Sequence, residues 1–283
     1  MPTVAIVSAG FMGSGLGAAL LSGGARVVTT LEGRSTRSRR LAGAAGLEIL
    51  PTLADAVAVA DVVLSVTPPS AAVDAARSIA ESLHTITPGP VVADLNAVSP
   101  GTMERVAREL GGLRVVDGSI SGPPPSVKPG ARVYLSGPEA EIVAGLPWAG
   151  MIEPVVLGER VGAASALKMC TGSVYKGLMG LLTQAMRTAG AHGVLDEVVD
   201  DLARNGLADN EGVARAATKA HRYVGEMREV AATQAEAGLS PDLFTAMADA
   251  FADIASTRLA GDDPENDRDL SPAEIVARLR RDG

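Results

Sequence analysis

Short apolar runs alternate with helical patterns along the first half of this 283-residue chain. The runs are rich in valine and continuous, which is typical of parallel strands that are covered on both faces. Strands are expected at Thr3–Val7, Arg26–Thr30, 61–66, 91–95, 113–116 and 132–136. Ala-rich amphipathic segments at 35–45, 71–83 and 100–110 are expected as the helices between them. This rhythm predicts an α/β fold with a doubly wound parallel sheet.

The alternation stops near residue 158. Segment 161–190 contains no proline and is dominated by helix formers, and further helical stretches follow it, so we expect an all-helical second half. Ser271 and Glu274, with Pro272 at the first helical position, predict a capped short helix near the end. The expected organisation is a sheet domain at 1–158, a helical substrate and dimerisation domain at 159–262, and a linker with a short helix at 263–283.

Composition narrows the class of protein. Apolar residues make up 47% of the chain, enough for packed cores, while aromatic residues make up only 2%, so small aliphatic side chains must fill those cores. The formal net charge of −8 argues against a nucleic-acid partner, because phosphate backbones attract basic surfaces. One cysteine, Cys170, excludes an internal disulfide, and three histidines show no metal-ligand spacing, so no metal site is expected.

The uncharged segment 2–25 could be mistaken for a signal peptide. It has no basic region before it, and four glycines from Gly10 to Gly17 interrupt its centre. No other stretch is long and apolar enough to span a bilayer. We therefore expect a cytoplasmic protein with no membrane association.

A glycine-rich turn follows the first expected strand. Gly10 and Gly13 occupy the second and third glycine positions of a G-x-G-x-x-G pattern, and Ser8 stands at the first. A pyrophosphate at such a turn needs close backbone approach and a helix N-terminus. The turn therefore predicts a Rossmann-type dinucleotide site that includes Ser8, Gly10, Phe11, Met12 and Gly13.

The end of the second expected strand selects the cofactor. Four arginines fall between residues 34 and 40. We assign Gly33, Arg34, Ser35 and Arg37 to a 2′-phosphate, because arginine binds phosphate through paired hydrogen bonds, and so favour NADP(H) over NAD(H). Glu32 is the competing signal for NAD. The alternative is that the arginines only form the basic first turn of a solvated helix. We favour this interpretation for Arg39 and Arg40.

Two later strands end in polar residues at the edge where cofactors lie in such folds. Thr67 and Pro68 follow one strand and are assigned to the cofactor site. Asn96 follows the next and is expected near the nicotinamide. An ordinary Asx turn before a helix explains Asn96 equally well.

Segment 117–122 precedes three consecutive prolines and is expected as a rigid Ser-Gly loop. Its N–H and hydroxyl groups, at Ser121 and Gly122, could bind a carboxylate. A stiff structural connection is the equal alternative.

Lys168 lies two turns into the expected long helix, and Gly172 and Tyr175 share its face. A partly buried lysine there could move a proton to or from the oxygen of a carbonyl/alcohol pair. Without the flanking motifs, a surface lysine on an Ala-rich helix would be the better interpretation.

Segments 9–13, 94–100, 117–122 and 162–168 together, in this order, resemble the β-hydroxyacid dehydrogenase family, whose relatives include 6-phosphogluconate dehydrogenase. The resemblance covers nearly the whole chain. It implies that Ser121 and Gly122 bind the substrate acid, that Lys168 is the catalytic lysine and that Asn96 is the asparagine of the site. Ser121 is counted among the catalytic residues as well.

The chain departs from the family pattern around the substrate. Gly172 stands where the family has an asparagine, and Gly225 and Glu226 stand where it has a Lys-Asp pair. We therefore expect a retained frame for hydride transfer and a rebuilt substrate pocket. The polar residues placed in that pocket are Tyr175, Lys176, His221, Arg222 and Tyr223.

The resulting hypothesis is an NADPH-dependent oxidoreductase that moves a hydride to or from a small hydroxy or keto acid, or a related carbonyl compound. Lys168 is its general acid/base. The alternatives are an imine reductase of the same architecture, although those enzymes generally lack this lysine, and a non-catalytic NADP(H)-binding protein. The long helix predicts a homodimer formed through the helical domain.

Overall fold

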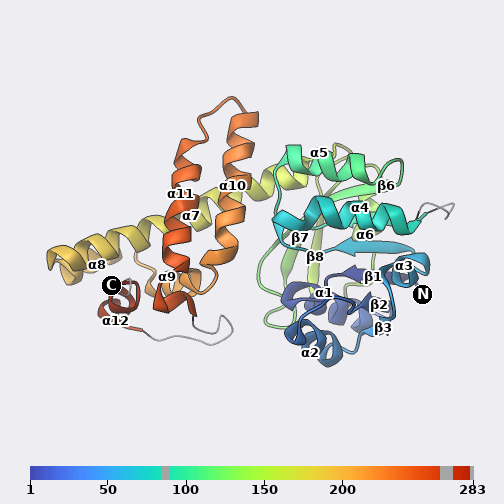
Figure 1. The fold of residues 1–283 in the computed structure, drawn as a ribbon, viewed down its shortest axis with the longest axis horizontal. Helices are drawn as coiled ribbons and strands as arrows, with labels where there is room; N and C mark the ends of the chain where they lie inside the picture. Colours follow the sequence, from blue (N-terminus) through green and yellow to red (C-terminus); the bar gives the residue numbers. More distant parts are fainter. Residues whose placement is uncertain (84–88, 262–269, 281–283) are drawn as a thin grey trace. The chain divides into compact units, whose positions relative to one another are not determined.

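The computed structural model describes residues 1–83, 89–261 and 270–280 (Figure 1). The chain forms two compact units, Met1–Met169 and Cys170–Gly283. The division lies inside the long helix α7, Ala163–His192.

The first unit is built on one eight-stranded sheet with the strand order β3-β2-β1-β4-β5-β6-β7-β8. All neighbouring strands are parallel except β6 and β7, which are antiparallel. The strands are β1 (Thr3–Val7), β2 (Arg26–Thr30), β3 (Glu48–Leu50), β4 (Val62–Ser65), β5 (Val91–Asp94), β6 (Arg114–Ser121), β7 (Ala131–Ser136) and β8 (Ile152–Val156). This order confirms the predicted doubly wound sheet, with its topological switch between β1 and β4.

Helices cover both faces of this sheet (Figure 1). One face packs against α1 (Phe11–Ser22), α2 (Thr36–Ala44) and α6 (Ala140–Ala144), and the other against α3 (Leu53–Ala58), α4 (Ala72–Leu83) and α5 (Pro100–Glu109). Successive strand residues enter opposite cores: Val4 and Ile6 join the first, Ala5 and Val7 the second. Burial on both faces explains why the strands are continuous apolar runs.

The structure differs from the sequence-based expectation at several elements. β3, β8, α3 and α6 were not predicted; β3 is three residues long, and two of its residues are exposed. Segment 117–121, expected as a loop, is strand, because β6 continues through it and pairs with β7. A Cβ atom on Gly118 would lie 2.3 Å from Leu95 Cδ2, so a glycine lets the strand pass its neighbour closely.

Trp148 completes the core beside α6. Its side chain is buried, and its Nε1 donates a hydrogen bond to the Val143 carbonyl at 3.1 Å. It is the only tryptophan in the chain.

The second unit is helical, as predicted. Its elements beyond α7 are α8 (Leu195–Arg204), α9 (Asn210–Ala217), α10 (Ala220–Glu236), α11 (Asp242–Ala255), the 3₁₀ turn η2 (Arg258–Gly261) and α12 (Pro272–Arg278). The Ser271–Glu274 capping box is present at the start of α12. The predicted linker falls mainly on 262–269, outside the described residues. Within the described ranges, no helix combines the length and apolar character needed to cross a bilayer.

A buried carboxylate fixes the start of α7 on the sheet. Asp117 of β6 is fully buried, and its Oδ2 accepts hydrogen bonds from the backbone N–H of Gly162 at 2.8 Å and of Ser165 at 3.1 Å. Its Oδ1 accepts from Ser165 Oγ at 2.6 Å, and Ser136 Oγ donates to Oδ2 at 3.0 Å. Asp117 therefore caps a helix that begins more than forty residues later in the chain.

Replacing this carboxylate is expected to destabilise the sheet unit strongly. Asp117→Ala strands several buried donors, each costing about 1–3 kcal/mol, so we expect a loss of about 3 kcal/mol or more in the free energy of unfolding. Urea unfolding followed by circular dichroism measures it. Asp61→Ala is the matched control, because that exposed carboxylate accepts a single hydrogen bond within the described residues, from the Thr3 N–H, and it should cost about 1 kcal/mol or less. Equal losses in the two variants would contradict the anchoring role of Asp117.

Candidate functional site

The turn after β1 leaves an open space at the N-terminus of α1. Gly10 caps this helix without a side-chain hydrogen bond, and no acidic side chain lies in its first turn. A Cβ atom on Gly10 would meet nothing within 4 Å. Ser8 has a φ of +75°, a left-handed conformation that costs a non-glycine residue on the order of 1 kcal/mol. The uncapped helix end offers N–H groups and partial positive charge, which suit a phosphate.

Other glycines of α1 have a packing role instead. A Cβ atom on Gly13 would lie 2.4 Å from the Ser8 carbonyl oxygen, and one on Gly17 would lie 2.7 Å from Leu47 Cδ2. Gly13 therefore allows the helix to approach its own strand. Among the residues that the structure describes, no atom lies close enough to require glycine at position 10, so this space is available to a ligand.

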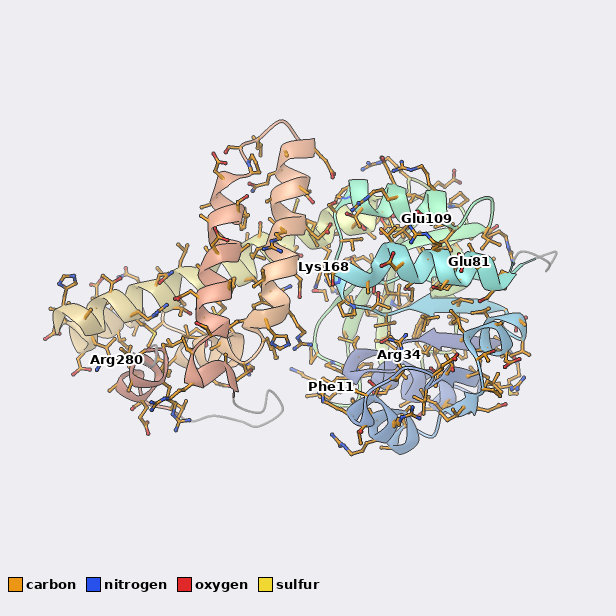
Figure 2. All side chains as sticks on the ribbon, in the orientation of Figure 1. Phe11, Arg34, Glu81, Glu109, Lys168 and Arg280 are labelled. Carbon is orange, nitrogen blue, oxygen red and sulfur yellow. The ribbon has the colours of Figure 1, made fainter. Side chains whose placement is uncertain are left out.

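The turn after β2 brings predicted cofactor residues beside the glycine turn. Gly33 has a φ of +66°, and Ser35 caps α2 by accepting a backbone hydrogen bond at 3.2 Å. The Arg37 guanidinium lies 5.8 Å from the centroid of the Phe11 ring, in cation–π contact. Figure 2 shows Phe11 and Arg34, which is half-buried, in this part of the sheet unit. Residues that follow the ends of β1 and β2 thus contact each other here.

Asn96 joins the ends of β4 and β5. Its Oδ1 accepts the backbone N–H of Thr67 at 2.6 Å, and its Nδ2 donates to Asp94 Oδ2 at 2.7 Å and to Ser65 Oγ at 3.3 Å. Asp94 Oδ1 also accepts the backbone N–H of Asn96 at 3.0 Å, so the Asx turn is formed by Asp94. Asn96 is 2% exposed and its amide is fully used, which makes it a clasp between the two loops.

Asp94 is the buried carboxyl group beneath this clasp. Burial raises the pKa of Asp94 to about 7, against the hydrogen bonds from Asn96 and Ser65, and the negative charge of Asp117 adds to the increase. Asp117 pairs with it in register on the neighbouring strand. A carboxyl group whose pKa lies near neutral is unusual. Such strongly shifted pKa values are typical of functional sites.

The Thr67 side chain supplies an independent sign of a ligand. Its Oγ1 is buried and, within the part of the chain that the structure describes, has no hydrogen-bond partner. An unsatisfied buried hydroxyl costs about 1–3 kcal/mol, so the polar group of a ligand at this edge would stabilise it. Pro68 follows and begins the 3₁₀ turn η1, Pro69–Ala71, which fixes the loop.

Lys168 reaches the end of β6 from the second turn of α7. Its Nζ donates a hydrogen bond to the Ile120 carbonyl at 2.6 Å, and burial lowers its pKa. Ser119 Oγ donates to the Ala164 carbonyl at 2.9 Å and ties the same turn to the strand. In Figure 2 Lys168 lies at the side of the sheet unit where Phe11 also lies. The ammonium group therefore lies at the residue that precedes Ser121 in the chain.

Ser121 and Gly122 end β6 in a constrained turn. Gly122 has a φ of +127°, and a Cβ atom there would lie 3.0 Å from the Ala131 Cα and Cβ atoms. The prolines that follow rest on α1, because a Cβ atom on Gly15 would lie 3.1 Å from Pro124 Cβ. This turn is thereby connected to the glycine-rich helix as well as to Lys168.

The remaining predicted substrate residues belong to the helical unit. Gly172 and Tyr175 lie on α7, and 68% of Tyr175 is exposed. Lys176 forms an ion pair with Glu226, and its Nζ lies 5.0 Å above the Tyr223 ring. Lys176, Glu226 and Tyr223 thus form one cluster within this unit.

Sequence reasoning gave no role to Asp94 or Asp117, the two carboxylates that organise the sheet edge. A signal was present, because each is an acidic residue in or at the end of a valine-rich buried strand. In the described ranges no three His, Cys, Asp or Glu side chains are grouped so that they could hold a metal ion.

Comparison with known families places the chain among nucleotide-binding proteins. Residues 3–147, half of the chain, match the family model of the NAD binding domain of 6-phosphogluconate dehydrogenase. Residues 189–254 match a domain of unknown function, DUF1932. A curated relative, an uncharacterized 28.5 kDa protein of Methanothermus fervidus, is 29% identical over 177 residues, which cover 62% of this chain and 66% of that protein, just under two thirds of its length.

Solved structures share the fold over most of the chain. A conserved protein of unknown function, reported as structurally similar to 3-hydroxyacid dehydrogenases, is 27% identical with a TM-score of 0.67 and covers 92% of this chain and 100% of its own. The 3-hydroxyisobutyrate dehydrogenase of Mycobacterium tuberculosis has a TM-score of 0.71 at 19% identity and covers 99% of both chains. An imine reductase of Myxococcus stipitatus has a TM-score of 0.58 at 20% identity and covers 90% of this chain and 92% of its own.

Two glycine substitutions distinguish a glycine that leaves space for a ligand from a glycine that packing requires. Gly10→Ala enters open space, so it should leave the unfolding free energy nearly unchanged and weaken dinucleotide binding at least tenfold, because the added methyl group occupies the phosphate position. Gly13→Ala meets backbone and should destabilise the fold itself. Gly43→Ala, also in open space but within α2, is the control and should keep full affinity. Calorimetric titration with thermal unfolding checks all three. Full dinucleotide affinity in Gly10→Ala would remove the phosphate site from this turn.

Proposed function

This chain belongs to the family defined by the NAD binding domain of 6-phosphogluconate dehydrogenase, and we propose that it is an NADPH-dependent oxidoreductase acting on a small hydroxy or keto acid, or a related carbonyl compound. The family match confirms the resemblance that the sequence motifs indicate. The chain therefore belongs to the class of nicotinamide-dependent oxidoreductases. The observation that carries the proposal is Lys168. Its partly buried ammonium group lies 2.6 Å from the Ile120 carbonyl, beside Ser121 and at the sheet edge where the glycine turn ends β1.

The proposed chemistry divides between the cofactor and the chain. When bound, NADPH supplies the hydride that reduces the substrate carbonyl carbon. Lys168 donates a proton from Nζ to the substrate oxygen during reduction and accepts it during oxidation. Burial supports this role, because it lowers the pKa of Lys168 toward the working range of a general acid/base. The Ile120 carbonyl orients the ammonium group.

Ser121 and Gly122 are proposed to hold the acid group of the substrate. Their turn lies beside Lys168, so an acid bound there presents a nearby carbonyl or hydroxyl group to Nζ. Asn96 is proposed to act by position. Its amide is fully occupied, and it holds the Thr67 backbone at the edge where the nicotinamide is expected.

The preference for NADPH is proposed from the turn after β2. Gly33, Arg34, Ser35 and Arg37 cluster there beside Phe11, and a guanidinium group binds the 2′-phosphate through charge-assisted hydrogen bonds. Glu32 is exposed and makes no side-chain hydrogen bond within the described residues that would fix it toward a ribose.

Imine reduction is the second candidate. It is supported by the fold shared with imine reductases, whereas the retained Lys168 favours oxygen chemistry. Gly172 in place of the family's asparagine, and Gly225 and Glu226 in place of its Lys-Asp pair, allow the non-catalytic alternative. Turnover of a cyclic imine with NADPH, and none of any hydroxy acid, would select it. NADPH binding without any turnover would select the non-catalytic alternative instead.

Removal of Lys168 tests the proposal directly. Lys168→Ala should lower turnover by about 10²- to 10⁴-fold and leave the affinity for NADPH close to that of the wild type. Lys168→Arg keeps the charge, but its guanidinium group does not release a proton near neutral pH, so this variant should be similarly slow. Lys128→Ala, which removes an exposed lysine, is the control. Unchanged turnover in Lys168→Ala would refute the assignment.

The arginine turn provides a test of cofactor choice. Arg34→Ala should weaken NADPH binding about tenfold or more and leave NADH binding nearly unchanged, because only NADPH carries the 2′-phosphate. Arg40→Ala removes an exposed arginine of the same segment and should affect neither. Fluorescence titration of the wild type and both variants with each cofactor measures the dissociation constants. If Arg34→Ala lost equal affinity for NADPH and for NADH, Arg34 would not contact the 2′-phosphate.

We also propose a homodimer formed through the helical unit, in a cytoplasmic protein whose single cysteine fits a reducing compartment. Val174 and Leu181 on α7 are 65% and 59% exposed, and Leu239 and Leu243 are similarly exposed near the α10–α11 turn. Val174 and Leu181 are seven residues apart on α7 and so share one face of the helix, and contiguous exposed apolar patches mark subunit contacts. Sedimentation equilibrium should give twice the mass of one chain for the wild type. Val174→Glu and Leu181→Glu should reduce this to the mass of a single chain. A monomeric wild type contradicts the dimer.

A further inference from the structure

Three cationic side chains gather at the corner between α9 and α10. Arg215 lies on α9, Lys219 is the N-cap of α10, and Arg222 lies in the first turn of α10. The corner is a tight turn, in which Lys219 N–H donates to the Ala216 carbonyl at 3.1 Å and Arg222 N–H donates to the Lys219 carbonyl at 2.9 Å. The positive charges of Arg215 and Arg222 both act on Lys219, so the three form one cluster.

The carboxylates one turn before Arg215 and one turn after Arg222 are already engaged. Glu211 pairs with Arg215 at 2.7 Å, and Glu226 pairs with Lys176 of α7. Neither Lys219 nor Arg222 forms an ion pair or a side-chain hydrogen bond with any residue that the structure describes. Two adjacent positive charges are therefore left without a counter-charge in this part of the unit.

The surroundings make this arrangement costly for the protein alone. Lys219 is half-buried, and its pKa is lowered first by burial and then by the positive charges of Arg222 and Arg215. Burial and Arg222 also lower the pKa of His221. Like charges and desolvation both act against the ammonium group, and a bound anion would remove both penalties.

A fixed aromatic side chain borders the cluster. Burial raises the pKa of Tyr223, so its hydroxyl stays a neutral hydrogen-bond donor. Its ring packs edge-to-face on Phe251, with centroids 5.3 Å apart. The tyrosine is thus held in place on the first turn of α10, next to Arg222.

We propose that Lys219 and Arg222, flanked by Arg215 and His221, form a binding site for the anionic group of a small molecule, either a carboxylate or a phosphate. A guanidinium group and an ammonium group together match the oxygens of both anions. That this small molecule is the substrate rests on the proposed function, whereas the anion site itself stands on the helical unit alone.

The experiment uses the full-length protein without cofactor, titrated with sodium phosphate or sodium acetate at constant ionic strength. The readout is the imidazole pKa of His221, followed by NMR and assigned with His221→Gln. Either anion should raise this pKa, because a negative charge next to the imidazole favours its charged form. The tighter of the two identifies the group as phosphate or carboxylate.

Variants localise the effect. Lys219→Gln and Arg222→Gln should each weaken the anion response at least tenfold, while Arg228→Gln, an exposed arginine on the same helix, should retain it. Gly10→Ala should also retain it, which excludes binding at the glycine turn. Lys219→Arg preserves the charge and should rescue the response, which separates anion binding from a folding defect.

Two results would overturn the site: no anion-dependent change at His221 in the wild type, or the same response in Lys219→Gln and Arg222→Gln. Neither result depends on turnover. A slow Lys168→Ala enzyme without any anion response would therefore keep the proposed function and remove this site.

Discussion

The architecture of the sheet edge depends on one buried carboxylate. Asp117 accepts two backbone N–H groups from the start of α7 and two serine hydroxyls, with donor–acceptor distances of 2.6–3.1 Å. These bonds stabilise its charge away from water and fix where the helix begins. Because Lys168 lies within two turns of that point, the same bonds set the position of its ammonium group. A structural cap therefore also positions the residue proposed to move a proton.

A second carboxyl group, Asp94, lies in register with Asp117 on the adjacent strand but has a different environment. Burial keeps its pKa near neutral, and its bonds lead through Asn96 to the Thr67 backbone. The ends of the neighbouring strands β4 and β5 are thus joined by side chains as well as by the backbone ladder. Such connections keep loops of a parallel sheet in one arrangement before a ligand arrives, which lowers the entropic cost of binding.

The sheet could be predicted because its strands are buried on both faces and carry uninterrupted valine-rich runs. β3 could not, since it is a short edge strand with exposed Glu48 and Ile49. That Lys168 and Ser121 act in one site stays a prediction from the order of the motifs. The role of Asp117 could not be predicted, because its partners in α7 lie up to 48 residues away, and spacing within a motif carries no information on such contacts. The Lys176–Glu226 pair escaped prediction for the same reason. Asp94 bonds Asn96 only two residues further on, but its raised pKa results from burial, which the motif does not reveal.

The scarcity of aromatic residues has an optical consequence. Trp148, the single tryptophan, is buried in the sheet unit, whereas the helical unit contains Tyr175 and Tyr223 but no indole. Ultraviolet emission excited at the red edge of protein absorption therefore originates from one half of the molecule only. Loss of order in that half can be observed in isolation, with no reporter group introduced.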